Sequence, residues 1–333
     1  MRVVTGGLQT TVQDLGRPAS QRQGVPAGGA MDRSALRAGN ALVGNDEDAA
    51  GLEATLIGPS LIFDRPTLVA IAGADLGATV DHEPLPAWHA ALVQAGATLR
   101  FGAARRGCRA YVVVAGGIDV PPVFGSRSTY LRAEFGGLEG RALRAGDVLT
   151  LGAPPRLSQR IAASLHGAGP VTVARWSVGP AVRPVYGDDA VVRLIPGEHT
   201  SALSPSSRER LFGERFRVSA SSDRMGYRLE GEPLSLASRI EMLSEAVAFG
   251  TVQLPPGGAP IVLMADRQTT GGYPRIGEVA SVDLPLVAQL KPGDHVRFRP
   301  ISLQDAQRLY LAREHELAQA RLGIALRFSR GTP

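Results

Sequence analysis

The stretch LKPGDHVRF, residues 290–298, indicates a β-strand that is entered through a glycine turn. Its Pro-Gly-Asp triplet is a turn signal, and Val296 and Phe298 then place apolar side chains on one face of the strand. The stretch LRAGDVLTL, residues 143–151, repeats this order, and LVQAGATLRF, residues 92–101, carries a third version. The copies at 143–151 and 290–298 each close a strand-rich half of the chain, which predicts duplicated β-barrel domains.

Short apolar runs recur around these repeats, each bounded by Gly, Pro, Asp or Asn. Their length and β-branched content favour strands over helices. They are Leu68–Ala72, Tyr111–Ala115, Val191–Ile195 and Ile261–Ala265. Glycine and proline are abundant, at 40 and 24 of the 333 residues, which is typical of a fold with many turns. We therefore expect a mainly β protein with a few helices.

Two helices and a linker complete the expected organisation. Asp32 can cap a helix whose apolar residues recur at helical spacing up to Gly44, and Ser302 can cap a C-terminal helix. The expected segments are residues 1–153 for the first β-barrel domain, 154–184 for a linker region, 185–300 for the second β-barrel domain and 301–328 for the C-terminal helix.

The formal net charge is +5, but the positive charge is scattered among acids and is almost entirely arginine, because Lys291 is the only lysine. A scattered charge argues against nucleic acid as a partner. No run approaches the ~20 apolar residues that span a bilayer, and the N-terminal residues lack the apolar core of a signal peptide. Cys108 is the single cysteine and is expected to be a buried structural thiol. These features predict a cytoplasmic protein.

Several common catalytic motifs are absent from the sequence. A Walker P-loop needs Gly-x-x-x-x-Gly-Lys-Ser/Thr, and Lys291 lies instead in Lys-Pro-Gly-Asp. The chain also lacks an Ala-Met-Lys-Met-like hairpin, so any biotin would have to arrive on another chain. The six histidines show no i,i+4 pairs and no neighbouring cysteine, so no metal site is predicted.

Four polar strings that contain glycine stand in otherwise apolar strand contexts. They are QTTVQDLGRP (9–18, followed by GGAMD at 28–32), GSRSTYLR (125–132), SDRMGYRL (222–229) and ADRQTTGGYPR (265–275). Arginine offers a planar donor fork for carboxylate or phosphate. Hydroxyl and backbone N–H groups can stabilise an oxyanion on an amide or lactam carbonyl. Taken singly, each string can also be a braced turn; only the string at 265–275 favours a ligand site, because so many polar groups directly follow an apolar strand.

Together these strings resemble the biotin-dependent carboxyltransferase family. That family includes the C subunits of 5-oxoprolinases (KipA-like proteins, also labelled allophanate hydrolase subunit 2) and part of the carboxyltransferase region of urea carboxylase. The resemblance runs from about Gly7 to Phe298. It implies two cyclophilin-like β-barrels and two partner chains, one KipI-like and one LamB/YcsF-like. It further implies that the assembled chains hydrolyse ATP while opening 5-oxoproline to L-glutamate, with ATP bound on this chain or on one of its partners.

The resemblance and the chemistry of the strings together nominate site residues. Asp266 and Asp223 are the acid–base candidates. The expected substrate-binding residues are Arg267, Gln268, Thr269, Thr270, Gly271, Gly272, Tyr273, Arg224, Tyr227, Arg127, Ser128, Thr129, Tyr130, Asp14 and Arg17.

The sequence departs from the family at one strand end. After Val191–Ile195 the family usually reads Pro-Gly-Pro-Gln, whereas this chain has Glu198 and His199 at the last two positions. An added acid and imidazole could change the ligand. Two other functions therefore stay open: a carboxyltransferase that moves CO2 from carboxybiotin to urea or a related amide, and a non-catalytic partner of a KipI-like kinase inhibitor.

Overall fold

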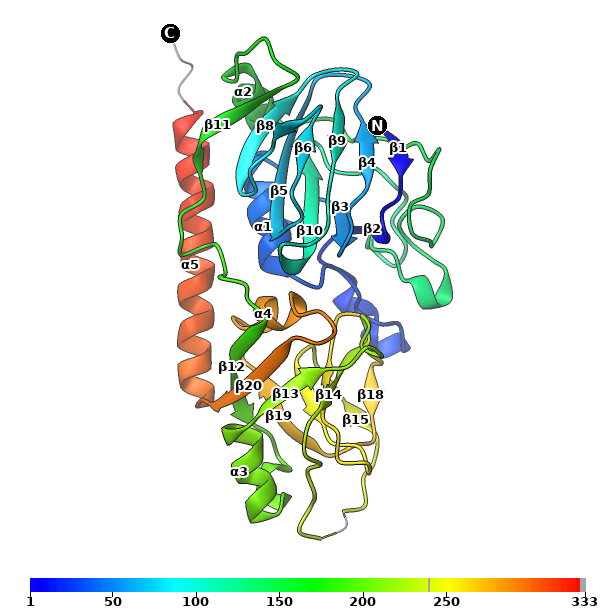
Figure 1. The fold of residues 1–333 in the computed structure, drawn as a ribbon, viewed down its shortest axis with the longest axis vertical. Coiled ribbons are helices and arrows are strands. Elements are labelled where there is room, and N and C mark those ends of the chain that lie inside the picture. Colours follow the sequence, from blue (N-terminus) through cyan, green and yellow to red (C-terminus); the bar gives the residue numbers. More distant parts are fainter. Residues whose placement is uncertain (239, 330–333) are drawn as a thin grey trace. The chain divides into compact units, whose positions relative to one another are not determined.

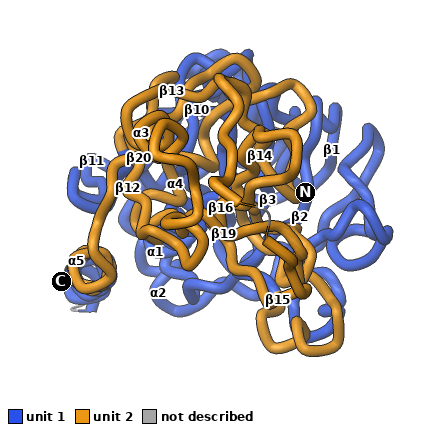
Figure 2. The backbone as a smooth tube through the Cα atoms, turned by 90° about the horizontal axis from the view of Figure 1, so that it is seen from below, with its two compact units in different colours: residues 1–16, 32–184, 314–333 blue, residues 17–31, 185–313 orange. Residues whose placement is uncertain are grey.

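The computed structural model describes residues 1–238 and 240–329, which divide into two compact units (Figures 1 and 2). The first unit contains residues 1–16, 32–184 and 314 onward, and the second contains residues 17–31 and 185–313. The mainly β fold predicted from the sequence is confirmed. The described part of the chain contains no helix that is both long and apolar enough to cross a membrane.

The strands of the first unit form two sheets. One has the order β1-β4-β9-β6-β7 and the other β11-β8-β5-β10-β3-β2. Their bounds are β1 Arg2–Thr5, β2 Gln9–Gln13, β3 Gly51–Thr55, β4 Ser60–Ile62, β5 Thr67–Asp75, β6 Thr79–Val80, β7 Glu83–Pro84, β8 His89–Val93, β9 Thr98–Arg100, β10 Arg106–Val114 and β11 Val171–Ser177. Leu61 and Leu99 of one sheet and Val69, Ile71 and Val112 of the other belong to one buried apolar cluster.

Helix α1 (Arg33–Leu42) packs against β5 and β10. Its predicted cap is confirmed, because Asp32 accepts a hydrogen bond of 2.9 Å from the backbone N–H of Ala35. The helix approaches the sheet closely at Gly39, where an added Cβ would lie 3.1 Å from the Val113 side chain. Cys108 is a buried thiol in β10, as expected from the sequence, and its sulfur lies 3.6 Å from Arg109 Nη1.

The second unit is built around a closed seven-stranded barrel of order β12-β19-β16-β17-β14-β13-β20, with a separate two-stranded sheet, β15-β18. The strand bounds are β12 Asp189–Pro196, β13 Arg215–Val218, β14 Gly226–Glu230, β15 Glu245–Ala246, β16 Thr251–Gln253, β17 Ile261–Leu263, β18 Thr270–Gly271, β19 Arg275–Val279 and β20 His295–Pro300. Phe216 and Phe298 fill the barrel with ring centroids 6.0 Å apart. Helices α3 (Pro205–Gly213) and α4 (Leu284–Ala288) complete the unit.

The three glycine turns found in the sequence share one hydrogen-bond pattern. Gly96, Gly146 and Gly293 all have positive φ, between 82° and 93°. In each turn the glycine N–H donates to a residue of a neighbouring strand or loop, and that residue's N–H donates back to the residue after the glycine. The reciprocal partners are Phe63 for Gly96 and Ala97, Val3 for Gly146 and Asp147, and Val218 for Gly293 and Asp294. The three turns are therefore alike in their hydrogen bonds, but 148–151 forms two isolated bridges rather than a regular strand, and the duplication stays a prediction.

The structure divides the chain differently from the predicted boundaries at three places. Residues 17–31 join the second unit, because the Gly28 N–H donates to the Ala265 carbonyl and Met31 packs in the barrel core. The predicted linker 154–184 contains α2 (Arg156–Ala163) and β11, which pairs with β8 of the first unit. The C-terminal helix α5 (Leu303–Arg327) begins after Ser302 as predicted, but residues up to 313 count with the second unit and the rest with the first.

Candidate functional site

The first two polar strings meet in the first unit around Asp14, which follows β2. One carboxylate oxygen of Asp14 accepts hydrogen bonds from Ser126 Oγ (2.6 Å), Ser128 Oγ (2.5 Å) and the Gly16 N–H (2.7 Å). The other oxygen accepts one from the backbone N–H of Arg127 at 2.5 Å. Four donors satisfy an ionised carboxylate. Asp14 therefore fixes the loop at 125–130 on the end of β2.

The hydroxyl residues of that loop are turned inward. Ser128 Oγ also accepts from the Asp14 N–H at 2.9 Å, while the backbone N–H and hydroxyl of Thr129 both donate to the Val12 carbonyl. The Tyr130 ring packs on Phe135 with centroids 5.4 Å apart. Arg127 behaves differently, because its side chain is 43% exposed and its guanidinium lies 3.6 Å from Asp119. Of the four predicted residues 127–130, Arg127 is thus the one whose side chain reaches outward.

The third and fourth strings meet in the second unit through a buried ion pair. Arg224 Nε lies 2.8 Å from one carboxylate oxygen of Asp266, and Arg224 Nη2 lies 3.0 Å from the other. The same Nη2 donates to the Gly29 carbonyl at 2.7 Å. Arg224 and Asp266 are only 7% and 4% exposed. This bidentate geometry holds both charges in fixed positions.

The start of the segment 17–31 adds a second buried guanidinium to this cluster. Gly28 has a φ of +61°, and an added Cβ would lie 3.2 Å from Arg17 Nη1 and 3.7 Å from the Asp266 carboxylate. Glycine is thus required for the backbone to pass between these two side chains. We call Arg17, Arg224, Asp266 and Arg267 the arginine cluster; all four side chains are buried.

Arg267 connects this cluster to the two-stranded sheet. Its Nε donates to the Val247 carbonyl at 3.2 Å, directly after β15, and the Val247 N–H donates to the Thr269 carbonyl. Gln268 and Thr269 are half-buried, whereas Thr270 and Gly272 are exposed. Gly271 allows close contact, because an added Cβ would lie 2.4 Å from the Gln253 amide nitrogen. The predicted residues 266–273 therefore follow one path from the barrel to the surface.

Two predicted residues, Asp223 and Tyr227, do not belong to the arginine cluster. Asp223 is exposed, and its carboxylate accepts hydrogen bonds from the N–H groups of Met225 (2.8 Å) and Gly226 (3.2 Å), which is an Asx-turn. Tyr227 is buried in the barrel core, where its hydroxyl donates to the Leu290 carbonyl at 3.1 Å. These contacts give both residues a structural task.

Sequence reasoning missed Glu278 in β19. This half-buried carboxyl accepts from the Thr251 hydroxyl at 2.9 Å on either oxygen. Burial raises the pKa of Glu278 above its usual range, while the hydrogen bond from Thr251 and the charges of Arg275 and Arg267 act in the opposite direction. A carboxyl group that follows the fourth string within an apolar strand is the signal that could have found it.

The departure at Glu198 and His199 acts on the same strand. Arg275 Nη2 lies 2.8 Å from the Glu198 carboxylate and 2.7 Å from that of Glu245 in β15. His199 Nδ1 accepts from the Arg275 N–H at 3.3 Å. The added acid and imidazole therefore contact the start of β19, and Arg275 itself links that start to β15.

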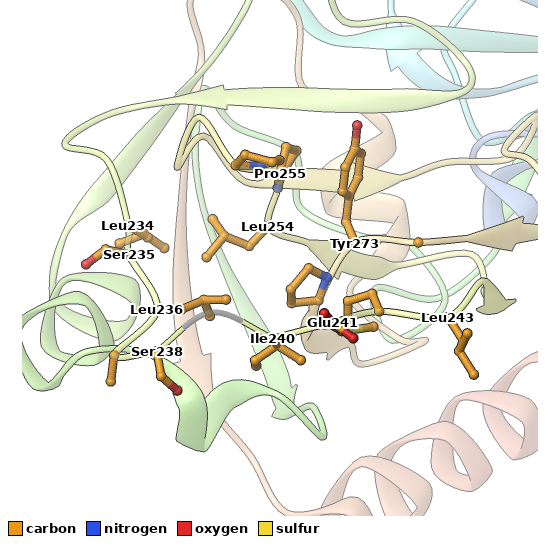
Figure 3. Close-up of a pocket in the computed structure, with 15 residues that line it drawn as sticks. Leu234, Ser235, Leu236, Ser238, Ile240, Glu241, Leu243, Leu254, Pro255 and Tyr273 are labelled. Atoms are coloured by element: carbon orange, nitrogen blue, oxygen red, sulfur yellow. The ribbon is translucent and has the colours of Figure 1, made fainter.

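A cavity of about 1240 Å³ adjoins the end of the fourth string (Figure 3). Figure 3 shows Leu254, Pro255 and Tyr273 on one side of it and Leu236 and Ile240 on the other. Among the residues that the structure describes, the lining is largely apolar and contains one charged side chain, that of Glu241. Lys291, the single lysine, is not among the lining residues of this cavity; its ammonium group lies 2.7 Å from the Asp294 carboxylate.

Comparison with known proteins identifies the family. A model of the carboxyltransferase domain, subdomain A and B, matches residues 23–300. The chain belongs to this carboxyltransferase family. A curated relative, the C subunit of 5-oxoprolinase from Haemophilus influenzae, is 39% identical over 94% of the chain and 95% of the relative. The C subunit of the Escherichia coli 5-oxoprolinase is 37% identical over 92% and 93%.

Larger members of the carboxyltransferase family contain a region that is similar to this chain. Urea amidolyase of Saccharomyces cerevisiae is 32% identical over 93% of this chain, which spans 17% of that protein. The crystal structure of the K. lactis urea amidolyase matches 96% of this chain with a TM-score of 0.86 and 30% identity, again over only 20% of its length. The same fold thus occurs both as a separate chain and within a longer enzyme.

Proposed function

We propose that this chain is the C subunit of an ATP-dependent 5-oxoprolinase, which opens 5-oxoproline to L-glutamate together with partner chains. The observation that carries the proposal is the match with the C subunits of two 5-oxoprolinases, which covers nearly the full length of this chain and of each relative. A match over the full length argues that this chain is one subunit of a similar enzyme, whose remaining parts are on other chains. One of these would be KipI-like and the other LamB/YcsF-like.

The arginine cluster supports an anionic substrate. 5-Oxoproline carries one carboxylate beside its lactam, and guanidinium groups recognise carboxylates through paired hydrogen bonds. Arg224 pairs with the Asp266 carboxylate, and Arg17 lies near that carboxylate across Gly28. Arg267 adds a third buried guanidinium, and its charge also acts on Glu278. In this proposal Asp266 orients Arg224, and the segment Thr269 to Gly272 supplies hydroxyl and N–H groups to the developing oxyanion.

The acid–base role would then fall to another carboxyl. Asp266 is bound by Arg224 and Asp223 closes a turn, whereas Glu278 has a raised pKa and can exchange a proton nearer neutral pH. ATP would phosphorylate the lactam oxygen, water would add to the activated carbon, and the C–N bond would break as the nitrogen takes up a proton. A second water would then release phosphate from the resulting acyl phosphate and leave L-glutamate. Since the sequence contains no P-loop, we propose that ATP is held by the complex and largely by a partner chain.

The test is reconstitution of the complex. Coexpression with the KipI-like and LamB/YcsF-like partners should give glutamate from 5-oxoproline only when ATP is present. Arg267→Gln should lower the rate in that complex, whereas Arg217→Gln, an exposed arginine of the same unit, should not. Formation of an intact complex with no ATP-dependent glutamate production would remove the proposal.

A carboxyltransferase acting on urea or a related amide is the second candidate, favoured by the matched domain model and by the urea amidolyase structure. Both reactions need donors for negative charge on an amide-type oxygen, so the same cluster would serve either. Biotin would be carried by another chain. Inhibition of the assembled enzyme by avidin would support this candidate, and insensitivity to avidin would remove it.

A further inference from the structure

A second, smaller cavity lies in the first unit, where the predicted residue Arg127 points outward. It has a volume of about 270 Å³, and its lining includes Arg127, Asp119, Asp46, Asp48 and the Gly116–Gly117 backbone. This cavity thus pairs one guanidinium with several carboxylates, unlike the largely apolar cavity of the second unit.

The backbones of Arg127 and Asp119 are held by hydrogen bonds, but the two side chains form only a long ion pair. The Arg127 N–H is held by Asp14, and the Asp119 N–H donates to the Thr150 carbonyl at 2.9 Å. The two side chains nevertheless lie 3.6 Å apart and are 43% and 56% exposed. Ion pairs at 2.5 to 2.9 Å elsewhere in the chain, such as Arg224–Asp266, are closer. An open pair of this kind can exchange its mutual contact for a ligand.

The acidic side of the cavity is braced from behind. Glu47 lies between Asp46 and Asp48 and forms ion pairs with Arg37 (2.7 Å) and Arg321. The Asn40 amide donates to the carbonyls of Glu47 and Ala49 at 3.3 and 2.7 Å. The loop is therefore held in place, and its two aspartates line the cavity and give it a negative field.

We propose that this cavity binds the head group of an α-amino acid, with the carboxylate at Arg127 and the ammonium group at Asp119. The inference rests on the proposed function, because ring opening converts the neutral lactam nitrogen of 5-oxoproline into the ammonium group of L-glutamate. A cavity with carboxylates beside a guanidinium discriminates between these two states. It therefore selects the product and not the substrate.

Calorimetric titration of the full chain tests the proposal without any turnover. L-Glutamate should bind at least about tenfold more tightly than glutarate or 5-oxoproline, which lack the ammonium group, since one charge-assisted hydrogen bond is worth that factor. Asp119→Asn and Arg127→Gln should each weaken glutamate binding by about tenfold or more. The control Arg65→Gln, at an exposed arginine of the same unit, should leave it unchanged.

Thermal midpoints of the variants show whether they are folded, which is expected because both side chains are half-exposed and the Arg127 N–H contact with Asp14 is retained. Equal binding of glutarate and glutamate, or no binding of glutamate up to about 10 mM, above usual substrate ranges, would overturn the proposal. This test and the reconstitution test can fail separately. Glutamate binding to the chain can still be measured if the complex has no 5-oxoprolinase activity, and the complex can be active even if this cavity binds no glutamate.

Discussion

Replacing Asp266 by asparagine tests whether this carboxylate orients Arg224 or takes part in the chemistry itself. The change keeps the volume of the side chain but removes the charge that meets Arg224 through two hydrogen bonds of 2.8 and 3.0 Å. Both partners are more than nine-tenths buried, so the guanidinium would keep its charge away from water without its carboxylate partner. Breaking one partner of a buried ion pair costs about 3–5 kcal/mol. We expect a loss of stability of this size.

The assay must report on the second unit. Both tryptophans, Trp88 and Trp176, lie in the first unit, so tryptophan fluorescence would follow the wrong part of the molecule. Hydrogen exchange of peptides covering β14 and β17, which carry the two loops, measures the opening free energy where the ion pair acts. The neighbouring exposed carboxylate provides the control: Asp223→Asn should cost about 1 kcal/mol or less.

A double-mutant cycle completes this experiment. When Arg224→Gln is added to Asp266→Asn, the combined cost should be well below the sum of the two single costs, because neither charge is then left alone. A cost of Asp266→Asn below about 1 kcal/mol, together with loss of activity in the complex, would refute our interpretation. Asp266 would then have to act on the substrate directly.

Three further predictions concern other parts of the chain. Burial raises the pKa of Glu278, so the folded state binds this proton more tightly than the unfolded state does. The free energy of unfolding should therefore fall as pH rises from the ordinary pKa of 4.5 through the pKa of the folded state. Glu278→Gln should remove that pH dependence in urea unfolding. Gly28→Ala should cost about 1–2 kcal/mol more than Gly24→Ala in the same exchange assay, because both glycines have positive φ but only Gly28 has side chains against it. Tyr111→Phe removes a buried hydroxyl that donates to Glu53 at 2.7 Å and should destabilise the first unit by about 1–3 kcal/mol, which tryptophan fluorescence can follow.

Much of the local structure could be predicted because it depends on short stretches of sequence. Short apolar runs that are rich in β-branched residues and bounded by turn residues favour strands, and 68–72 and 111–115 fall largely inside β5 and β10. The helix caps at Asp32 and Ser302 involve residues three positions away. The three glycine turns were also visible, since they need positive φ and therefore keep a recognisable sequence.

The candidate site could be predicted only as a set of residues. The structure divides the four strings into an Asp14 centre and an arginine cluster, and this division depends on which strands are neighbours. The sequence alone suggested Asp266 and Asp223 as equivalent acids, whereas their surroundings give one a buried guanidinium partner and the other an exposed turn. Glu278 was overlooked for the same reason, because its raised pKa arises from burial that no local pattern encodes.

The sequence by itself determined the mainly β fold, the repeated turns, the helix caps and the residue types that can receive an anion, because each depends on interactions within a few positions. Only the tertiary structure decided that residues 17–31 join the barrel, that Arg224 meets Asp266 and that Arg127 faces Asp119. Those pairings join residues eight or more positions apart in the chain, and their energies depend on distance and exposure to water. Both quantities exist only once the strands have assembled.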